Sequence, residues 1–310
     1  SRLEAVSADE WRCRVTTAPP SVPPPVPPAS PTATDGGPGP IANAGRPLLD
    51  VDAISISFGG LKAVQDFSLS IPRGALYGLI GPNGAGKTTV FNLLTGVYSC
   101  QSGAVTLDGR RIDTLRPHEI AAAGLCRTFQ NIRLFPDLSV LDNVRLGCHL
   151  RGRHSLVRTL LRTPGFVRQE DAMTRKSLSL LEVFGLADRA QEPAKSLPYG
   201  DQRRLEIIRA LATEPKLLLL DEPAAGMNPH EKIELARSIE SIRERFKLTV
   251  LLIEHDMGLV MDICEQIAVL DYGRRIAFGP PTQIQRDPRV IEAYLGEPGA
   301  HGAGENGGAA

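Results

Sequence analysis

The sequence predicts an α/β protein in which a mostly parallel sheet is covered by helices on both faces. Three observations indicate this class. Short apolar runs of strand length recur along the chain, for example residues 217–220 and 250–253. A segment with helical periodicity, residues 229–246, separates these two runs, and a glycine-rich loop joins another run to a short helix. Strands that alternate with helices are typical of parallel sheets with helices on their faces.

The first two predicted strands precede the glycine-rich loop. Residues 48–58 and 67–71 alternate apolar and polar side chains, as half-buried strands do. We expect Asp66 and Phe67 to open the second strand, and the turn at residues 72–74 to close it.

Buried strands and helices follow. Residues 75–80 are continuously apolar, which predicts a strand covered on both faces. Residues 88–96 predict a short helix that ends at Gly96. The region of residues 131–213 is mainly helical in pattern, with apolar side chains at helical spacing. These side chains include Leu178, Leu181 and Phe184.

The last third of the chain returns to strands. Residues 216–221, 248–255 and 267–270 each predict a strand. Residues 270–279 predict a hairpin, and residues 287–296 predict a final helix. The strand–helix alternation in this region is the main support for the parallel sheet.

Composition excludes several classes of protein. The chain has 310 residues, is 42% hydrophobic and carries 35 basic and 35 acidic side chains, so it does not bind nucleic acid through bulk charge. Its five cysteines form no C-x-x-C pair, which indicates a reducing compartment without structural zinc. No apolar run approaches the roughly 18 residues that span a bilayer. We expect a soluble, cytoplasmic protein.

Both ends of the chain differ in composition from the centre. Residues 1–46 are rich in proline without hydrophobic periodicity, which predicts a disordered or polyproline II extension. A ligand for proline-binding domains is the alternative to a passive extension. Residues 297–310 predict a flexible tail. One domain is therefore expected over residues 47–296.

The glycine-rich loop carries the pattern G-x-x-x-x-G-K-[ST] between a predicted strand and a predicted helix. Its glycines allow backbone N–H groups to surround phosphate oxygens, and the helix N-terminus adds partial positive charge. We expect Lys87 to reach the β- and γ-phosphates and the Thr88 hydroxyl to bind Mg²⁺. An ordinary glycine-rich turn is the alternative. The predicted phosphate-binding residues are Gly81, Pro82, Asn83, Gly84, Ala85, Gly86, Lys87, Thr88 and Thr89.

Two acids end the apolar strand of residues 217–220. A buried strand delivers its last side chains to the carboxyl edge of the sheet, where α/β folds bind ligands. We expect Asp221 to hold Mg²⁺, directly or through water, and Glu222 to orient or deprotonate the attacking water. A solvated Asp-Glu turn is the alternative, which the phosphate loop disfavours.

Three further side chains are candidates for nucleotide contact. His255 follows a buried strand and could hydrogen-bond a γ-phosphate oxygen, although a lone histidine is more often structural. Gln130 lies where the strand pattern gives way to helices, and its amide could link Mg²⁺ or water to a mobile segment. Phe58 could stack on adenine. It also continues the alternation of Ile54 and Ile56, so a core position is the competing interpretation.

The order of these motifs resembles the ATP-binding cassette of ABC transporters over residues 48–296. Several segments look more specifically like the ATPase subunits of branched-chain amino acid importers. These segments are "FGGLKAV", "GPNGAGKTTVFNLLTG", "RTFQNIRLFPDLSVLDNV", "YGDQRRLEIIRALAT", "DEPAAGMNP", "IEHDM" and "VIEAYLG". The resemblance implies a P-loop NTPase core (RecA-like, with a mostly parallel sheet), an antiparallel β subdomain and a helical subdomain at about residues 131–215. It also implies ATP and Mg²⁺ as cofactors.

The resemblance assigns roles to the candidate residues. Glu222, His255 and Gln130 are implied to be catalytic, and Thr88, Gln130 and Asp221 are implied to bind the metal. The stretch "LPYGDQ" corresponds to the signature motif, usually Leu-Ser-Gly-Gly-Gln, which caps the γ-phosphate held by a facing subunit. The residues implied to act in this way are Pro198, Tyr199, Gly200, Asp201 and Gln202.

This sequence departs from the family pattern within and after the signature motif. Pro198 replaces the usual serine and removes a hydroxyl donor, and Tyr199 replaces the first glycine. Gly200 keeps the close backbone approach. Asn228 stands where aspartate is more usual in the loop that follows the paired acids.

The function implied is that of an ATP-hydrolysing subunit of an importer, most closely one for branched-chain amino acids. Its implied partners are membrane-spanning permease subunits, a second ABC ATPase subunit (a copy or a paralogue) and, indirectly, a solute-binding protein, with no nucleic acid. The segment of residues 131–199 would dock the permease, with Gln130 as hinge. The protein would lie at the inner face of the cell membrane.

Three alternatives stay open. One is the ATPase of a related system for lipopolysaccharide or another amphipathic or amide solute. Another is a non-transport cassette of translation or DNA repair, which usually has two cassettes or a long coiled coil. The sequence predicts neither feature. The third is a regulatory module without turnover, which the presence of Glu222 and His255 disfavours.

Overall fold

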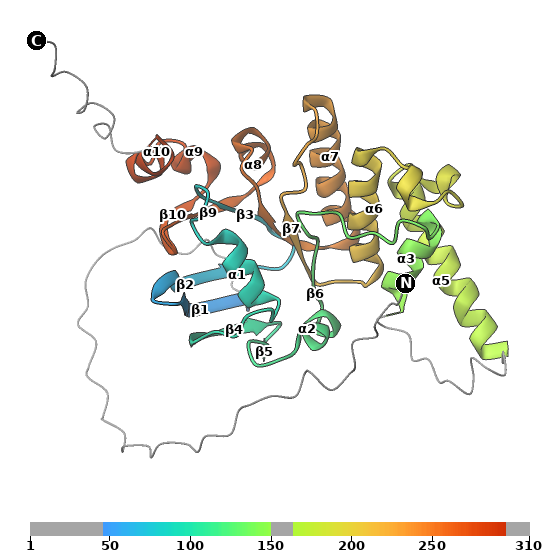
Figure 1. Ribbon diagram of the computed structural model, residues 1–310, viewed down its shortest axis with the longest axis horizontal. Helices are drawn as coiled ribbons and strands as arrows, with labels where there is room; N and C mark the ends of the chain where they lie inside the picture. Colours follow the sequence, from blue (N-terminus) through green and yellow to red (C-terminus); the bar gives the residue numbers. More distant parts are fainter. Residues whose placement is uncertain (1–45, 150–163, 296–310) are drawn as a thin grey trace, which may run out of the picture. The chain divides into compact units, whose positions relative to one another are not determined.

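Two β-sheets organise the computed structural model, which describes residues 46–149 and 164–295 (Figure 1). All neighbouring strands of the larger sheet are parallel except one antiparallel pair at the edge, formed by residues 266–271 and 274–279. In spatial order its strands are β10 (Arg274–Gly279), β9 (Gln266–Asp271), β3 (Leu76–Ile80), β8 (Thr249–Ile253), β7 (Leu217–Asp221) and β6 (Leu125–Arg127). The mostly parallel α/β class expected from the sequence is confirmed.

The smaller sheet is antiparallel and forms from the N-terminal part of the described chain. In spatial order its strands are β2 (Leu61–Ile71), β1 (Leu49–Phe58), β4 (Ser102–Leu107) and β5 (Arg110–Arg111).

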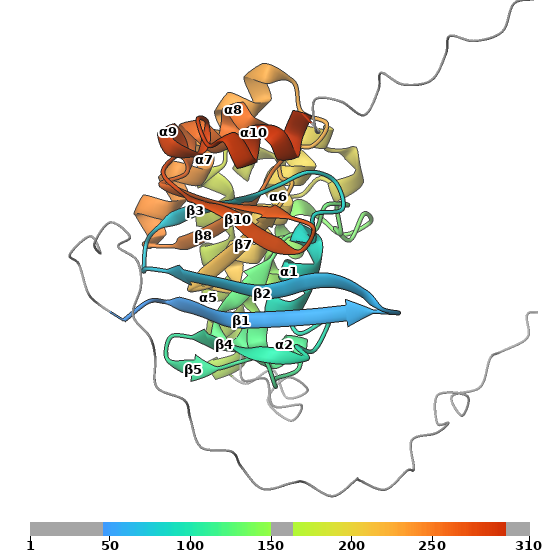
Figure 2. The same ribbon diagram turned by 90° about the vertical axis from the view of Figure 1, so that its left-hand side faces the viewer.

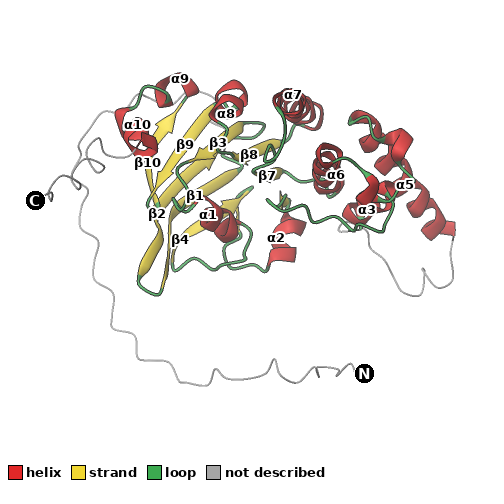
Figure 3. Cartoon of the chain, turned by 45° about the horizontal axis from the view of Figure 1, so that its top comes forward, coloured by secondary structure: helices red, strands yellow, loops and turns green. Residues whose placement is uncertain are grey.

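The helices fall into two groups. Those in the first group flank or follow the strands: α1 (Lys87–Leu94), α2 (Pro117–Ala123), α7 (Pro229–Phe246), α8 (Met257–Ile263), α9 (Pro281–Ile284) and α10 (Pro288–Leu295). Those in the second group gather to the right of β7 in Figure 3. They are α3 (Val140–Cys148), α5 (Pro164–Val183) and α6 (Tyr199–Ala212), with short 3₁₀ turns at Ala187–Arg189 and Ala194–Ser196.

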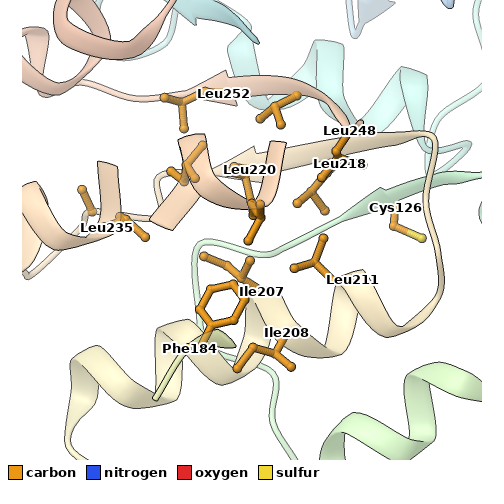
Figure 4. Packing of buried hydrophobic residues seen from close by; sticks show 14 of the residues in the cluster. Cys126, Phe184, Ile207, Ile208, Leu211, Leu218, Leu220, Leu235, Leu248 and Leu252 are labelled. Atoms are coloured by element: carbon orange, nitrogen blue, oxygen red, sulfur yellow. The ribbon is translucent and has the colours of Figure 1, made fainter. Parts of the chain in front are cut away.

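The larger sheet is buried on both faces, which explains why its strands are apolar without alternation. Leu218 and Leu220 of β7 point to the face covered by helices, where they meet Ile207 and Leu211 of α6 (Figure 4). Leu217 and Leu219 point to the opposite face and join the core formed with α1 and the antiparallel sheet. Figure 2 shows this layered order, with α7 to α10 on one side and β1, β2 and β4 on the other.

Several predicted elements are confirmed at their expected positions. Residues 229–246 form α7, which starts with the Asn228 side chain accepting from the Glu231 N–H and with Pro229 in the first turn. The hairpin predicted at residues 270–279 is β9 and β10, and the final helix is α10.

Two expectations about individual residues are wrong. Asp66 does not open the second strand, because β2 already begins at Leu61 and continues through Asp66. Asp66 has φ 46° and lies where the β1–β2 register shifts, so it marks a bulge within the strand. Of the three apolar side chains expected at helical spacing, Leu181 and Phe184 are buried, but Leu178 is 37% exposed and Leu180 is buried in its place.

Part of the sequence-based domain description lies outside the described residues. This applies to all but the last residue of the extension at 1–46, to the tail at 297–310, and to residues 150–163 within the helical region. Among the described helices, none combines the length and apolarity required to cross a membrane.

Candidate functional site

The candidate site forms where parallel strands of the larger sheet end side by side. Strand β3 leads into the phosphate loop, β7 ends at Asp221, and Glu254 and His255 directly follow the end of β8. Asp221 lies in register with Ile253 of β8, so the two chain segments leave the sheet together. Ligands bind at this edge in open α/β sheets because the loops there diverge from the carboxyl ends of the strands.

Two glycines of the phosphate loop have no tolerated substitute. Gly81 has φ 151°, and a Cβ atom there would lie 2.0 Å from the carbonyl oxygen of Leu270. Gly86 has φ 102°, and its Cβ would lie 2.5 Å from the carbonyl oxygen of Ala63. Gly86 is also the N-cap of α1, so no side chain covers the first N–H groups of that helix. The loop therefore presents a helix N-terminus suited to an anion.

Lys87 fills the centre of this loop. Its ammonium donates hydrogen bonds to the carbonyl oxygens of Gly81 at 2.6 Å and Pro82 at 3.0 Å. Burial lowers the pKa of Lys87, whereas the nearby charges of Glu222 and Asp221 act in the opposite direction. The side chain thus lies between the phosphate loop and the two acids, where a bound phosphate group would add negative charge.

The remaining loop residues differ in accessibility. Ala85 is buried, and Pro82, Gly86 and Thr89 are half-buried. Asn83, Gly84 and Thr88 are exposed. The hydroxyl of Thr88 is thus accessible in the first turn of α1, as the sequence-based hypothesis requires of a metal ligand.

Asp221 is buried and paired with an arginine that sequence reasoning missed. The Arg127 guanidinium donates to the Asp221 carboxylate at 2.6 Å and to the Asn92 side chain at 2.6 Å. Both members of the ion pair have less than a tenth of their side chains exposed. The rings of Phe91 and Phe129 each lie 5.4 Å from the guanidinium carbon.

Three side chains predicted to be catalytic meet at the edge of the sheet. The Gln130 amide donates to Glu222 at 2.8 Å, and His255 Nδ1 lies 3.8 Å from the same Glu222 oxygen. The imidazole is 60% exposed. Glu222 adopts φ 47°, and its N–H donates to the Ile253 carbonyl at 2.9 Å. This backbone conformation directs the residue after β7 out of the strand.

A buried acid, Glu254, supports this arrangement and was also missed. Its carboxylate accepts from the N–H of Ala224 at 2.7 Å and of His255 at 3.2 Å. Burial raises the pKa of Glu254, while these backbone hydrogen bonds oppose the increase. Glu254 thereby joins the segment after Glu222 to the segment that carries His255.

Phe58 lies at the end of β1 with an exposed ring. Ile54 and Ile56 are buried, but Phe58 is 43% exposed and contacts Tyr98 edge-to-face at 5.1 Å between centroids. The core interpretation of Phe58 is therefore wrong, and an exposed aromatic face stays available for a base.

The signature segment does not join the phosphate loop of its own chain. Pro198, Gly200 and Asp201 line a pocket with Met227 and Glu231. The phosphate-loop residues 82–85 line a different pocket, with the β9–β10 turn and α10. Tyr199 begins α6, and the Gln202 amide donates to the Leu197 carbonyl at 2.9 Å.

Comparison with known families decides the identity of the fold. The family model described as ABC transporter matches residues 64–225, which is more than half of the chain. The chain belongs to the ABC transporter family. A second model, described as branched-chain amino acid ATP-binding cassette transporter, matches residues 274–300 of this ABC protein.

Similar proteins support the same assignment. The cassette is 46% identical over 252 residues to the high-affinity branched-chain amino acid transport ATP-binding protein LivG of Salmonella typhimurium, covering 81% of this chain and 99% of LivG. It is 35% identical to the lipopolysaccharide export system ATP-binding protein LptB of Escherichia coli, covering 78% and 94%. A crystal structure of an ABC transporter cassette in an ADP conformation superposes with TM-score 0.72 at 30% identity, covering 82% of this chain and all of that one.

The P-loop NTPase class expected from the sequence is confirmed by these comparisons. As an ABC ATPase, the chain binds nucleotide and hydrolyses ATP. It is an ATP-binding subunit of the branched-chain amino acid type. The residues that sequence reasoning missed are Arg127, Arg203, Glu206 and Glu254, and all four are charged side chains buried or nearly buried in the structure.

Proposed function

We propose that this cassette hydrolyses ATP to power the import of branched-chain amino acids through a separate membrane permease. The observation that carries the proposal is the meeting of Gln130, Glu222 and His255 beside the Lys87 loop. This arrangement occurs in a chain that matches 99% of the length of LivG.

The carboxyl edge of the larger sheet provides the nucleotide site. The phosphates lie on residues 81–89, and the exposed ring of Phe58 stacks on the adenine. The Thr88 hydroxyl, the Asp221 carboxylate and the Gln130 amide oxygen would hold Mg²⁺, which would neutralise charge on the phosphate oxygens. These hard oxygen donors suit Mg²⁺, which takes few protein ligands beside phosphates and water.

Hydrolysis is then a matter of positioning. Glu222 orients or deprotonates the attacking water, and the Gln130 hydrogen bond fixes the direction of its carboxylate. His255, exposed next to Glu222, donates to a γ-phosphate oxygen. The Lys87 ammonium leaves the carbonyl oxygens of Gly81 and Pro82 and binds the phosphates. In phosphoryl transfer the protein performs little covalent chemistry beyond this positioning.

A second cassette completes each site. Pro198, Gly200 and Asp201 line a pocket separate from that of their own phosphate loop. The signature segment, residues 198–202, therefore caps the ATP of a facing subunit, either a copy or a paralogue. ATP drives closure insofar as it contacts the closed pair better than the open one. The helical region of about residues 131–215 moves with this closure.

An apolar groove lies between the sheet core and the helical region. It encloses about 410 Å³ and is lined by Val97, Ile120, Phe129, Phe135, Leu146 and Ala210, among others. Phe129 joins this groove directly to Gln130. We assign the groove to a cytoplasmic segment of the permease, which places the cassette on the inner face of the membrane. A solute-binding protein acts only through that permease.

The test is transport by the assembled system. The full chain is co-expressed with the membrane proteins that copurify with it and reconstituted in vesicles. The vesicles are supplied with ATP, the solute-binding protein and labelled leucine, isoleucine or valine. We expect ATP-dependent uptake that disappears with Glu222→Gln. Stimulation of ATPase activity by lipopolysaccharide and not by amino acids would instead favour the export function of LptB.

A further inference from the structure

The signature helix α6 holds the loop that carries Gln130 through one buried arginine. Arg203, on the second turn of α6, is 3% exposed. Its guanidinium donates to the Phe129 carbonyl at 2.8 Å and to the Gln130 carbonyl. Two backbone acceptors on consecutive residues match the planar fork of an arginine, which a lysine cannot reproduce.

The hydroxyl of Tyr199 also contacts this guanidinium. Its oxygen accepts from Arg203 Nε at 3.2 Å and from Nη2 at 3.1 Å. The same Nη2 atom therefore contacts both Tyr199 and the Gln130 carbonyl. Tyr199 is the residue that replaces a glycine of the usual signature motif, and a glycine there has no group that could make these contacts.

A buried glutamate completes the connection. Glu206 is 2% exposed and lies 3.4 Å from Arg203. Its other oxygen accepts from the N–H groups of Phe129 at 3.4 Å and Arg133 at 3.5 Å. The Gln130 loop is thus bound to α6 through its carbonyl groups by Arg203 and through its N–H groups by Glu206.

The connection continues to the acid next to β7. The Gln130 side chain donates to Glu222 at 2.8 Å, so three successive polar contacts lead from Tyr199 through Arg203 and Gln130 to Glu222. The Tyr199 ring also packs near Gly226 in the loop that follows Glu222, where a Cβ atom would lie 3.3 Å from the ring.

We propose that Tyr199 and Arg203 are positioning residues that connect the two ATP sites served by one chain. Tyr199 keeps Arg203 on the Gln130 loop, and Arg203 keeps Gln130 on Glu222. This inference rests on the proposed function, in which the signature segment serves the facing subunit's ATP while Gln130 and Glu222 serve the chain's own. Movement of the signature turn on the facing nucleotide is passed to Glu222 by these contacts, a coupling between two binding sites.

Hydrogen exchange tests the positioning role without any turnover. Tyr199→Phe removes one hydroxyl and leaves the ring, and Arg203→Lys removes the fork while keeping the charge. In the full chain without nucleotide, we expect amides of residues 129–133 to exchange about threefold faster or more in both variants. Tyr272→Phe, which removes the hydroxyl of a residue 84% exposed, is the matched control and should leave the segment unchanged.

A double-mutant cycle tests the connection to catalysis. We expect Tyr199→Phe to lower kcat about three- to tenfold while the KM for ATP changes less than about twofold. In a Gln130→Ala background the same substitution should have no further effect on kcat, because the contact it supports is already absent. The melting temperature of each variant shows that the fold persists.

The outcomes distinguish failure of the positioning role from failure of the proposed ATPase function. Unchanged exchange in Tyr199→Phe, an equal loss of kcat with and without Gln130, or a raised KM with normal kcat would each overturn the positioning role. The last of these would show that Tyr199 contacts the facing ATP directly. A wild-type chain that hydrolyses no ATP, alone or with its permease, would overturn the proposed function instead, and the exchange measurement would still decide the role of Tyr199.

Discussion

Glu222 combines an unusual backbone conformation with two functional neighbours. Its φ of 47° lies in the left-handed region, which is uncommon for residues other than glycine. Such conformations persist where surrounding structure holds them, and here the Glu222 N–H donates to Ile253 while its side chain accepts from Gln130. The carboxylate is therefore fixed in direction before any nucleotide arrives, as a general base requires.

Replacing this carboxylate by an amide tests its role. Glu222→Gln should retain ATP binding and lower turnover by roughly 10²–10⁴-fold, the usual scale for a general base. The variant should accumulate closed, ATP-bound dimers, measured by gel filtration with ATP beside phosphate release. The matched control is Glu240→Gln, an exposed glutamate of α7. Turnover of Glu222→Gln within a factor of two of wild type would exclude the role.

The pair of Arg127 and Asp221 permits a test that does not depend on activity. Arg127→Met leaves the Asp221 carboxylate buried without its cation, which typically costs about 3–5 kcal/mol in the free energy of unfolding. Adding Asp221→Asn removes the unpaired charge and should restore part of this loss. Chemical denaturation of both single variants and the double variant measures the coupling. Strictly additive losses would show that the two side chains do not stabilise each other.

The residues of the site differ in whether neighbouring sequence alone could predict them. The phosphate loop, Asp221 and Glu222 were predictable because their chemistry depends on consecutive residues at the end of a strand. Arg127 was not, because its partner lies on the neighbouring strand, and the adjacency of β6 and β7 exists only in the folded sheet. The same reason hides Arg203, whose acceptors are backbone atoms more than 70 residues earlier.

At the scale of elements, length decided which ones could be predicted. Helix α7 has 18 residues with repeated apolar positions and a capping box, so both its ends were evident. Strand β6 has three residues and α8 has seven, too few for either periodicity to emerge. The bulge at Asp66 hid the first half of β2 for a different reason, since it interrupts the alternation that identifies a strand.

Helix α8 depends on one aspartate for its position next to His255. Asp256 caps the helix by accepting from the Leu259 N–H at 3.1 Å and pairs with Lys232 of α7 at 2.5 Å. The hydrogen bond from Lys232 contributes most to lowering the pKa of Asp256, and the hydrogen bond from the Leu259 N–H contributes next. Because the folded pKa lies below the unfolded value of 3.8, ionised Asp256 stabilises the fold above that pH.

We therefore expect Asp256→Ala to lower the free energy of unfolding at pH 7 by about 0.5–2 kcal/mol. The difference from wild type should shrink as the pH falls through the lowered pKa of the folded carboxyl. Asp256→Asn retains a capping oxygen, so its free energy of unfolding should lie between those of wild type and Asp256→Ala. Denaturation curves at neutral and acidic pH measure all three. A loss that stays constant down to acidic pH would show that the charge of Asp256 contributes nothing.

At the scale of the whole molecule, the proposed function requires one chain to contribute halves of two different ATP sites. The phosphate loop and the signature segment line separate pockets of the described structure. A sequence contains no information about which chain faces which, so only the family resemblance predicted the shared site. The structure adds a physical connection between the signature segment and the Gln130 loop. Helix α6 begins in the signature segment, and its Arg203 side chain holds the Gln130 loop.

Mixing two inactive variants tests whether the halves meet across a dimer. Lys87→Ala removes charge from the phosphate loop. Gly200→Glu places an anion where a backbone amide should approach the γ-phosphate, in a pocket that already contains Glu231 and Asp201. Each variant alone should abolish phosphate release. In a mixed dimer one site carries both lesions and the other carries none, so part of the activity should return.

If both motifs instead served the same chain's nucleotide, every site would keep one lesion and mixing would restore nothing. Crosslinking must first show that mixed dimers form, which also establishes that the chain pairs with itself. A dimer of one wild-type chain and one doubly substituted chain provides no intact site when the sites are shared and one intact site when they are not. Activity in that dimer together with none in the mixture would therefore refute the shared site, and the proline and tyrosine of the signature segment would then act only within their own chain.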